Sequence, residues 1–134
     1  MGFLDKWQPQ LLSVLRIVTG LLFLEHGTAK LLHFPQVAMF AGQLPPLMTG
    51  AGIIEIVGGV LVVVGFFSRF AAFVLSGEMA VGYFMAHAPQ SFFPLINRGD
   101  AAILYCFVFF YLVFAGPGPW SLDALIWPRT GGRA

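Results

Sequence analysis

A chain of 134 residues, 58% of them hydrophobic and 10% charged, is long enough for one domain and more apolar than water-soluble domains of that length. Its net charge of +1 excludes a basic surface of the kind that binds nucleic acid. The only cysteine, Cys106, excludes an internal disulfide, a CxxC redox pair and a thiolate metal cluster.

Four apolar segments predict membrane-spanning helices, since about 20 residues cross about 30 Å of hydrocarbon. They cover residues 11–32, 47–67, 70–86 and 101–115. Only Ser68-Arg69 separates the second from the third, and one helix of their combined length would overshoot the bilayer, so we expect a hairpin. The fourth is short, but Asp100 precedes it and Gly116-Pro117-Gly118-Pro119 ends it. The chain is therefore predicted to be all-α, a single domain over residues 1–134 that forms an integral membrane four-helix bundle.

Three further segments connect or follow these spans. Residues 33–46 read as a loop in which a short interfacial helix is expected over 35–41, because its apolar side chains suit the headgroup boundary. Residues 88–99 form the other long loop, and the tail 120–127 is expected along the interface, where tryptophan is favoured. There is no convincing sequence repeat, and a two-plus-two arrangement of hairpins is left open.

The distribution of lysine and arginine predicts the orientation, because cytoplasmic loops carry an excess of both. With an even number of spans, one side of the membrane holds Lys6, Arg69, Arg129 and Arg133. The other side holds Lys30 and Arg98. We therefore expect both termini in the cytoplasm and the two long loops outside.

Acidic residues are rare in this chain, yet most of them fall in the predicted spans. Of the six, four lie within or at the edge of a span: Glu25, Glu55, Glu78 and Asp100. A carboxylate at the centre of a membrane helix costs about 2.5–3.5 kcal/mol on insertion scales, so such residues usually face the interior of a bundle. These acids are the feature of the sequence that most needs a function.

Helical periodicity predicts which residues share a face with them. On the first span, one stripe holds Arg16, Gly20, Phe23, Gly27 and Lys30, with His26 beside it and Glu25 on the opposite side. On the second, Glu55 lies in a row of small residues that includes Gly52, Gly58 and Gly59. On the third, one face holds Ala71, Glu78, Gly82 and Met85. On the fourth, one face holds Asp100, Leu104, Phe107, Tyr111 and Phe114, which predicts an acidic rim above an aromatic wall.

These faces and the expected orientation predict a polar cavity that opens outward. The outer half of the membrane would hold His26, Lys30, Glu55, Asn97, Arg98 and Asp100, with Glu78 near mid-depth. The structural alternative is that Glu55 and Glu78 only tie helices together, through Arg16, Lys30 or Arg98.

Other signals in the sequence are weaker. His26 and His87 could in principle ligate a haem or a metal, but histidine at a helix end usually only forms hydrogen bonds, so no metal and no covalently bound cofactor are expected. Cys106 is interpreted as a small apolar side chain of the core.

The order of motifs along nearly the whole chain resembles the DoxX family of small bacterial membrane proteins. The first is Arg16-x3-Gly20-x2-Phe23-x2-His26-Gly27-x2-Lys30-Leu31. The second is Glu55-x2-Gly58-Gly59-x-Leu61-x3-Gly65-x3-Arg69. The others are Asn97-x-Gly99-Asp100 and Gly116-Pro117-Gly118-x2-Ser121-x-Asp123. The family usually reads Asn-Gly-Gly-Glu where this chain has Asn97-Arg98-Gly99-Asp100, and Glu25 stands where an apolar residue is expected.

The resemblance implies a protein of the bacterial inner membrane with links to quinone and to thiol or sulfur redox chemistry, similar to the membrane subunit of thiosulfate:quinone oxidoreductase. The leading hypothesis is a membrane component of a quinone-linked redox system. In it, a quinone or small reductant binds between Lys30, Glu55, Glu78 and the aromatic face of the fourth span, and soluble redox partner proteins or the quinone supply electrons. Whether the chain is an enzyme by itself is left open.

The main alternative is a small proton-coupled transporter, which would be a homo-oligomer, and a third is a membrane scaffold that recruits soluble enzymes. The candidate ligand-binding or proton-exchanging residues are Glu55, Glu78, His26, Lys30, Asn97, Arg98, Asp100 and Arg16.

Overall fold

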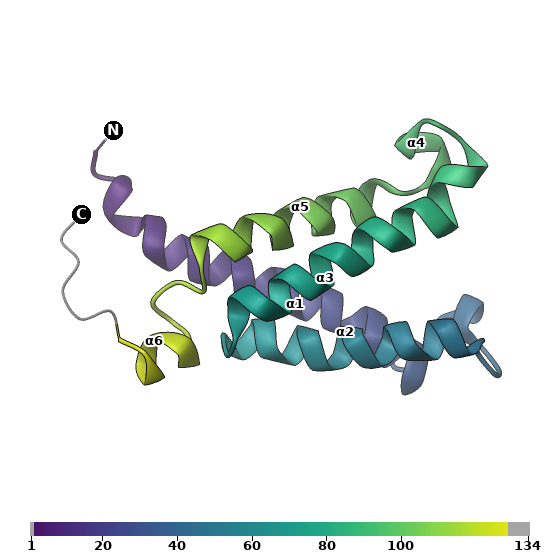
Figure 1. The fold of residues 1–134 in the computed structure, drawn as a ribbon, viewed down its shortest axis with the longest axis horizontal. Coiled ribbons are helices and arrows are strands. Elements are labelled where there is room, and N and C mark those ends of the chain that lie inside the picture. The colour runs from purple at the N-terminus through teal and green to yellow at the C-terminus, as the bar shows by residue number, and fades with distance from the viewer. Residues whose placement is uncertain (1, 129–134) are drawn as a thin grey trace.

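The computed structural model describes residues 2–128, and every regular element there is helical. The long helices are α1 (Gln8–Leu31), α2 (Pro46–Val64), α3 (Ser68–Gly82) and α5 (Asp100–Ala115) (Figure 1). The short ones are α4 (Pro94–Asn97), α6 (Leu122–Ile126), a π-helical turn (Tyr83–His87) and 3-10 turns at Asp5–Trp7, Ala38–Phe40 and Ala88–Gln90. The all-α prediction is confirmed.

Within residues 2–128, three helical stretches are long and apolar enough to cross a membrane: Asp5–Leu31, Pro46–Val64 and Ser68–Gln90. Helix α5 is also apolar, but its 16 residues cover only about 24 Å at about 1.5 Å per residue. Large apolar side chains point away from the bundle, and Leu21, Val57 and Phe73 are each more than half exposed. Because so much exposed apolar surface suits lipid and not water, the chain is a membrane protein.

The long helices pack as two antiparallel pairs, α1 with α2 and α3 with α5 (Figure 1). Contact between α2 and α3 joins the pairs, whereas α1 meets α5 at few positions. The arrangement is therefore two plus two. One end of the bundle, the turn end, holds the start of α1, the α2–α3 turn and α6. The other, the loop end, holds residues 32–45 and 83–99.

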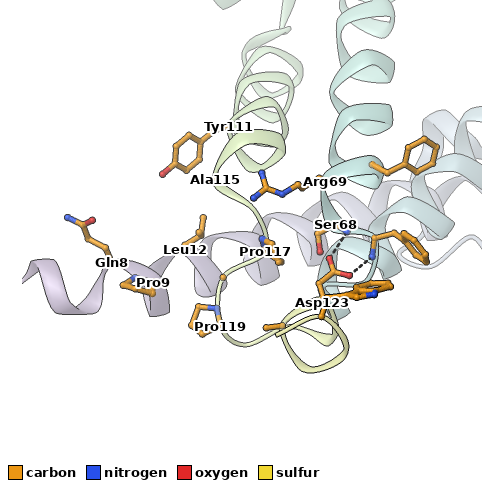
Figure 2. A pocket seen from close by; sticks show the side chains of 15 residues that line it. Gln8, Pro9, Leu12, Ser68, Arg69, Tyr111, Ala115, Pro117, Pro119 and Asp123 are labelled. Carbon is orange, nitrogen blue, oxygen red and sulfur yellow. Dashed lines mark hydrogen bonds between the residues drawn. The ribbon is translucent and has the colours of Figure 1, made fainter. Parts of the chain in front are cut away.

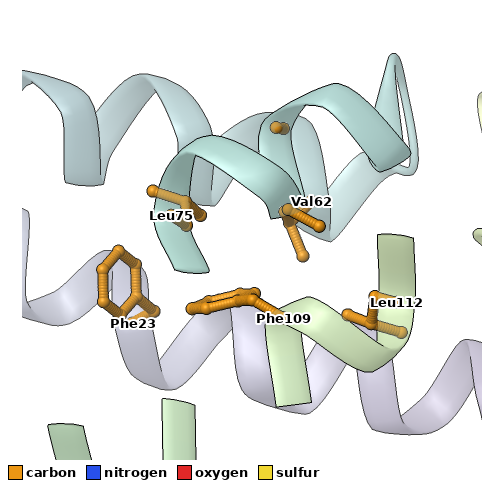
Figure 3. Close-up of a cluster of buried hydrophobic side chains, with 7 residues drawn as sticks. Phe23, Val62, Leu75, Phe109 and Leu112 are labelled. Atoms are coloured by element: carbon orange, nitrogen blue, oxygen red, sulfur yellow. The ribbon is translucent and has the colours of Figure 1, made fainter. Parts of the chain in front are cut away.

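Glycines let α1 and α2 approach closely, as the small-residue rows predict. A Cβ atom at Gly27 would lie 2.9 Å from the backbone nitrogen of Ile56, and one at Gly59 would lie 3.2 Å from the Cα of Leu24. The apolar core lies where all the long helices meet (Figure 3). Its largest members are Phe23, Val62, Leu75, Phe109 and Leu112.

The expected hairpin between the second and third spans is present, but its turn lies earlier than predicted. Helix α2 ends at Val64, and Gly65 takes a left-handed conformation (φ 72) that its missing side chain permits. The N–H groups of Gly65 and Phe66 both bond to the carbonyl of Leu61, which is a glycine-terminated helix end. The turn therefore occupies residues 65–67, because the helix stops at its glycine and not where apolar residues end.

One expectation about local structure is confirmed only in part, and another is wrong. Where a helix was predicted over 35–41, the chain forms only the 3-10 turn Ala38–Phe40, because Val37 and Ala41 on either side are extended. The predicted inward face of the fourth span points outward instead. Its members Leu104, Phe107, Tyr111 and Phe114 are exposed, while Phe109 and Leu112 are buried. Helix α5 is apolar on all sides, so its sequence has no periodic signal to mark the buried face.

Candidate functional site

An ion pair joins α1 to α2 near the loop end. Lys30 Nζ lies 2.5 Å from Glu55 Oε1, and Glu55 is 2% exposed. The close approach at Gly27 sets this distance, since a Cβ there would lie 3.0 Å from the Cβ of Glu55. The Lys30 ammonium also lies 5.6 Å from the centre of the Phe40 ring. Glu55 thus faces the interior and contacts Lys30, as the helix faces predict.

The carboxyl group of Glu78, on α3, is buried beside this ion pair without a hydrogen bond. Both of its oxygens, and Oε2 of Glu55, have no partner among the described residues. Glu78 is close enough to Glu55 and Lys30 for their charges to act on it. A buried carboxylate with no hydrogen bond is costly, so this group is stable only if it holds a proton or meets a ligand.

Aromatic rings of α1 and α5 pack against each other, with Phe23 and Phe109 buried and His26 exposed, and the rings of α5 are not the ones predicted. The rings of Phe23 and Phe109 are 5.0 Å apart, and Phe23 and Tyr105 are 5.4 Å apart. His26 meets Tyr105 edge to face at 5.8 Å. Of these residues, only Phe23 belongs to the stripe of α1 that periodicity predicts, and the packing of α3 against α5 selects Phe109.

Asn97 stabilises the loop between α3 and α5. Its hydrogen bonds in the described structure do not involve Glu55 or Glu78. Its side chain donates to the Tyr83 hydroxyl at 3.1 Å and the Ser91 carbonyl at 2.9 Å, and it accepts from the Gly99 N–H at 2.8 Å. The Asn97 carbonyl also bonds Nδ1 of His87. Arg98 and Asp100, on either side of Gly99, are exposed. Every bond that Asn97 makes is within residues 83–99, so its observed role is to shape this loop.

Arg16 belongs to the opposite end of the bundle. It is 1% exposed and donates to the carbonyls of Val62, at 2.9 Å, Trp120, at 2.7 Å, and Pro117. Fourteen residues separate Arg16 from Lys30, or about 21 Å along α1 at about 1.5 Å per residue. Arg16 therefore forms hydrogen bonds with carbonyl groups at the carboxyl end of α2 and does not meet Glu55 or Glu78.

Two further charged residues at the turn end, Asp123 and Arg69, form hydrogen bonds with the backbone at helix ends, and the sequence predicts a partner for neither. Both carboxylate oxygens of Asp123 accept, one from the N–H of Phe67 at 2.8 Å and one from the N–H of Ser68 at 2.9 Å, which caps the start of α3. Arg69 Nη1 donates to the carbonyls of Val113 and Phe114 at the end of α5. A capping residue is normally sought beside its own helix, and Asp123 is 55 positions from Ser68.

Two adjoining grooves open at the turn end. The larger, of about 920 Å³, lies between the starts of α1 and α3, the end of α5 and α6 (Figure 2). The smaller, of about 590 Å³, runs along α1 beside Tyr111. Neither groove is lined by Lys30, Glu55 or Glu78. These grooves are therefore not the polar cavity that the sequence predicts around those residues.

Comparison with known proteins identifies the family of this chain. The DoxX family model matches residues 11–88. A Haemophilus influenzae protein described as uncharacterized is 46% identical over 129 residues, which is 92% of this chain and 96% of the relative. An uncharacterized membrane protein of Mycobacterium tuberculosis is 29% identical, over 91% of this chain and 85% of the relative. No solved structure matches significantly. With the membrane-length helical stretches Asp5–Leu31, Pro46–Val64 and Ser68–Gln90 and a family match that covers more than half of its residues, the chain belongs to the DoxX family of membrane proteins.

Proposed function

We propose that this protein is the membrane component of a quinone-linked redox system, in which Glu78 exchanges protons with a quinone or small reductant bound beside it. The observation that carries the proposal is the buried Glu78 carboxyl group without a hydrogen-bond partner among the described residues. In this proposal α5 completes a four-helix membrane bundle. Its apolar, exposed outer face supports that role.

The ligand would enter where the two helix pairs meet. Lys30 and Glu55 belong to the α1–α2 pair, whereas Glu78 and Tyr105 belong to the α3–α5 pair. Sites between helices of a bundle are common, and separation of α1 from α5 would open a path from the lipid. The His26 and Tyr105 rings lie along that seam and would contact the flat head of a quinone.

The chemistry assigned to the chain is proton transfer. Reduction of a quinone to a quinol takes up two electrons and two protons. Glu78 and Glu55 would pass the protons, and Lys30 would stabilise the carboxylate left after each transfer. The electrons would come from a small reductant or a soluble redox partner protein.

One observation favours a second function, a small proton-coupled transporter. The two buried carboxyl groups lie on different helix pairs, with Glu55 on α2 and Glu78 on α3. If the pairs rock against each other, the separation of these two carboxyl groups changes, as alternating access in transporters requires. A bound substrate and a proton would then compete for the same group.

Analysis of molecules that co-purify distinguishes the two functions. The quinone proposal expects a quinone extracted with solvent from the protein purified in mild detergent, in proportion to the protein. It also expects that quinone to be displaced by added short-chain quinone. Protein free of quinone that releases protons on addition of a small solute, and moves it into vesicles, would support the transporter instead.

We also propose that both termini lie in the cytoplasm of a bacterium, with the protein in the inner membrane. Lys6 and Arg69, both at the turn end, support this orientation. Arg129 and Arg133 lie outside the described residues. In a Cys106→Ala background, we expect a cysteine at Ser91 to react with a membrane-impermeant maleimide in intact spheroplasts, and a cysteine at Gly131 to react only after lysis. Labelling of the Gly131 variant in intact spheroplasts would reverse the orientation.

A further inference from the structure

The two grooves at the turn end form one continuous amphipathic site. They share Gln8, Leu12 and Tyr111. The larger, which we call the head groove, has polar lining from Ser68, Arg69 and Asp123. The smaller, which we call the tail groove, is lined by Leu11, Val14, Leu15 and Val18 of α1. A mostly apolar groove that carries a few polar side chains at one end and continues into a second apolar groove matches the amphipathic character of a lipid.

The head groove contains hydrogen-bond donors that have no acceptor among the described residues. Arg69 uses Nη1 for the carbonyls at the end of α5, while Nε and Nη2 have no acceptor among the described residues. The Ser68 hydroxyl is buried in a residue that is 3% exposed, and it too has no partner in the described part of the chain. Figure 2 shows the Arg69 guanidinium between the start of α3 and the end of α5.

The carboxylate of Asp123, in the head groove, repels a bound anion less than its full charge suggests. Each oxygen of Asp123 already accepts a backbone N–H, from Phe67 and from Ser68, at the positive end of α3. The unused donors of Arg69 and Ser68 therefore favour an acceptor with negative charge, and a phosphate provides several such oxygens.

The tail groove follows a seam that protein does not fill. Its α1 residues are exposed, and so is Tyr111 across from them on α5. Because α1 and α5 contact each other at few positions, the groove between them stays open to the lipid. Its apolar lining fits a hydrocarbon chain.

We propose that a phospholipid binds at the α1–α5 seam, with its phosphate at Arg69 and Ser68 and an acyl chain in the tail groove. The depth agrees, since Arg69 lies in the first turn of the membrane-length helical stretch Ser68–Gln90, where lipid phosphates lie. Trp127 also lines the head groove, and tryptophan favours this depth. This inference does not depend on the quinone proposal.

Phospholipid retained after detergent washing tests the proposal, with phosphorus analysis and native mass spectrometry as readouts. Wild type is expected to retain phospholipid in proportion to the protein. Arg69→Gln should retain about tenfold less, because it loses a hydrogen bond between charged groups. Arg98→Gln is the matched control, since it removes an exposed cation at the loop end, and it should retain phospholipid like wild type.

Arg69 also bonds to the end of α5, so a second pair of variants separates lipid binding from folding. Val14→Trp should fill the tail groove and reduce retention without touching Arg69. Val60→Trp adds the same bulk at an exposed position of α2 and should not. Unchanged retention in both Arg69→Gln and Val14→Trp would overturn the proposal, as would a quinone or detergent molecule found there in place of phospholipid.

Discussion

Gly59→Leu is expected to prevent formation of the bundle. A Cβ at this position would already lie 3.2 Å from both the Cα and the Cβ of Leu24, and the remaining carbons of leucine would have to displace α1. An extra methylene in a packed core costs about 1–3 kcal/mol, and a leucine in place of glycine adds several. We expect Gly59→Leu to lose most of the monodisperse protein on size exclusion in mild detergent. The yield of Gly59→Ala should lie between those of wild type and Gly59→Leu.

Val60→Leu is the matched control for this prediction. Val60 is the next residue of α2 and is exposed, so added bulk there meets lipid or detergent and not a helix. It should behave like wild type. If Gly59→Leu and Val60→Leu gave equal yields and thermal stability, the contact between α1 and α2 would not depend on close approach at this glycine.

Glu78→Gln is expected to abolish proton-coupled function while the fold survives. Glutamine nearly preserves the volume of glutamate, removes the group that titrates, and breaks no hydrogen bond of the described structure. Loss of a general acid or base typically lowers a rate by about 100-fold or more. Quinone reduction with an added reductant, measured in proteoliposomes, or proton release on substrate addition, is the readout. Thermal stability should change little.

Two other carboxyl groups are compared with Glu78: Glu25 is the control for activity, and Glu55 is the comparison for stability. Glu25→Gln makes the same chemical change at an exposed position of α1 and should leave the rate unchanged. Glu55→Gln breaks the ion pair and leaves Lys30 without its partner, which costs about 3–5 kcal/mol for a buried pair. It should therefore lower stability most. Collapse of the bundle in Glu78→Gln, with normal activity in the folded fraction, would make Glu78 a structural tie.

The interior faces of α1 and α2 could be predicted from sequence because small residues mark them. Gly20, Gly27 and Gly59 are the positions where the two backbones approach, and the charged residues Lys30 and Glu55 lie in the same rows. Glu78 could be predicted as an interior acid for the energetic reason that a charge in lipid is costly.

The other candidate residues lie apart from Glu55 and Glu78. The positions of the predicted spans in the sequence do not indicate this separation. Arg16 was grouped with the interior acids because it shares a stripe with Lys30, but it lies at the turn end on backbone carbonyls. Asn97 is close in sequence to Arg98 and Asp100, yet only Asn97 is buried. Periodicity assigns a residue to a face of its own helix and gives no information about the depth or direction of its partner.

Hydropathy and small-residue spacing were sufficient to determine that the chain is helical, where the long apolar helices lie and which sides of α1 and α2 are buried, because each of these properties is local to one segment. Only the tertiary structure decided which side of α5 faces the core, since that helix is apolar all round. It alone decided the partners of Arg16, Arg69 and Asp123, because the backbone groups that these side chains satisfy belong to segments distant along the chain.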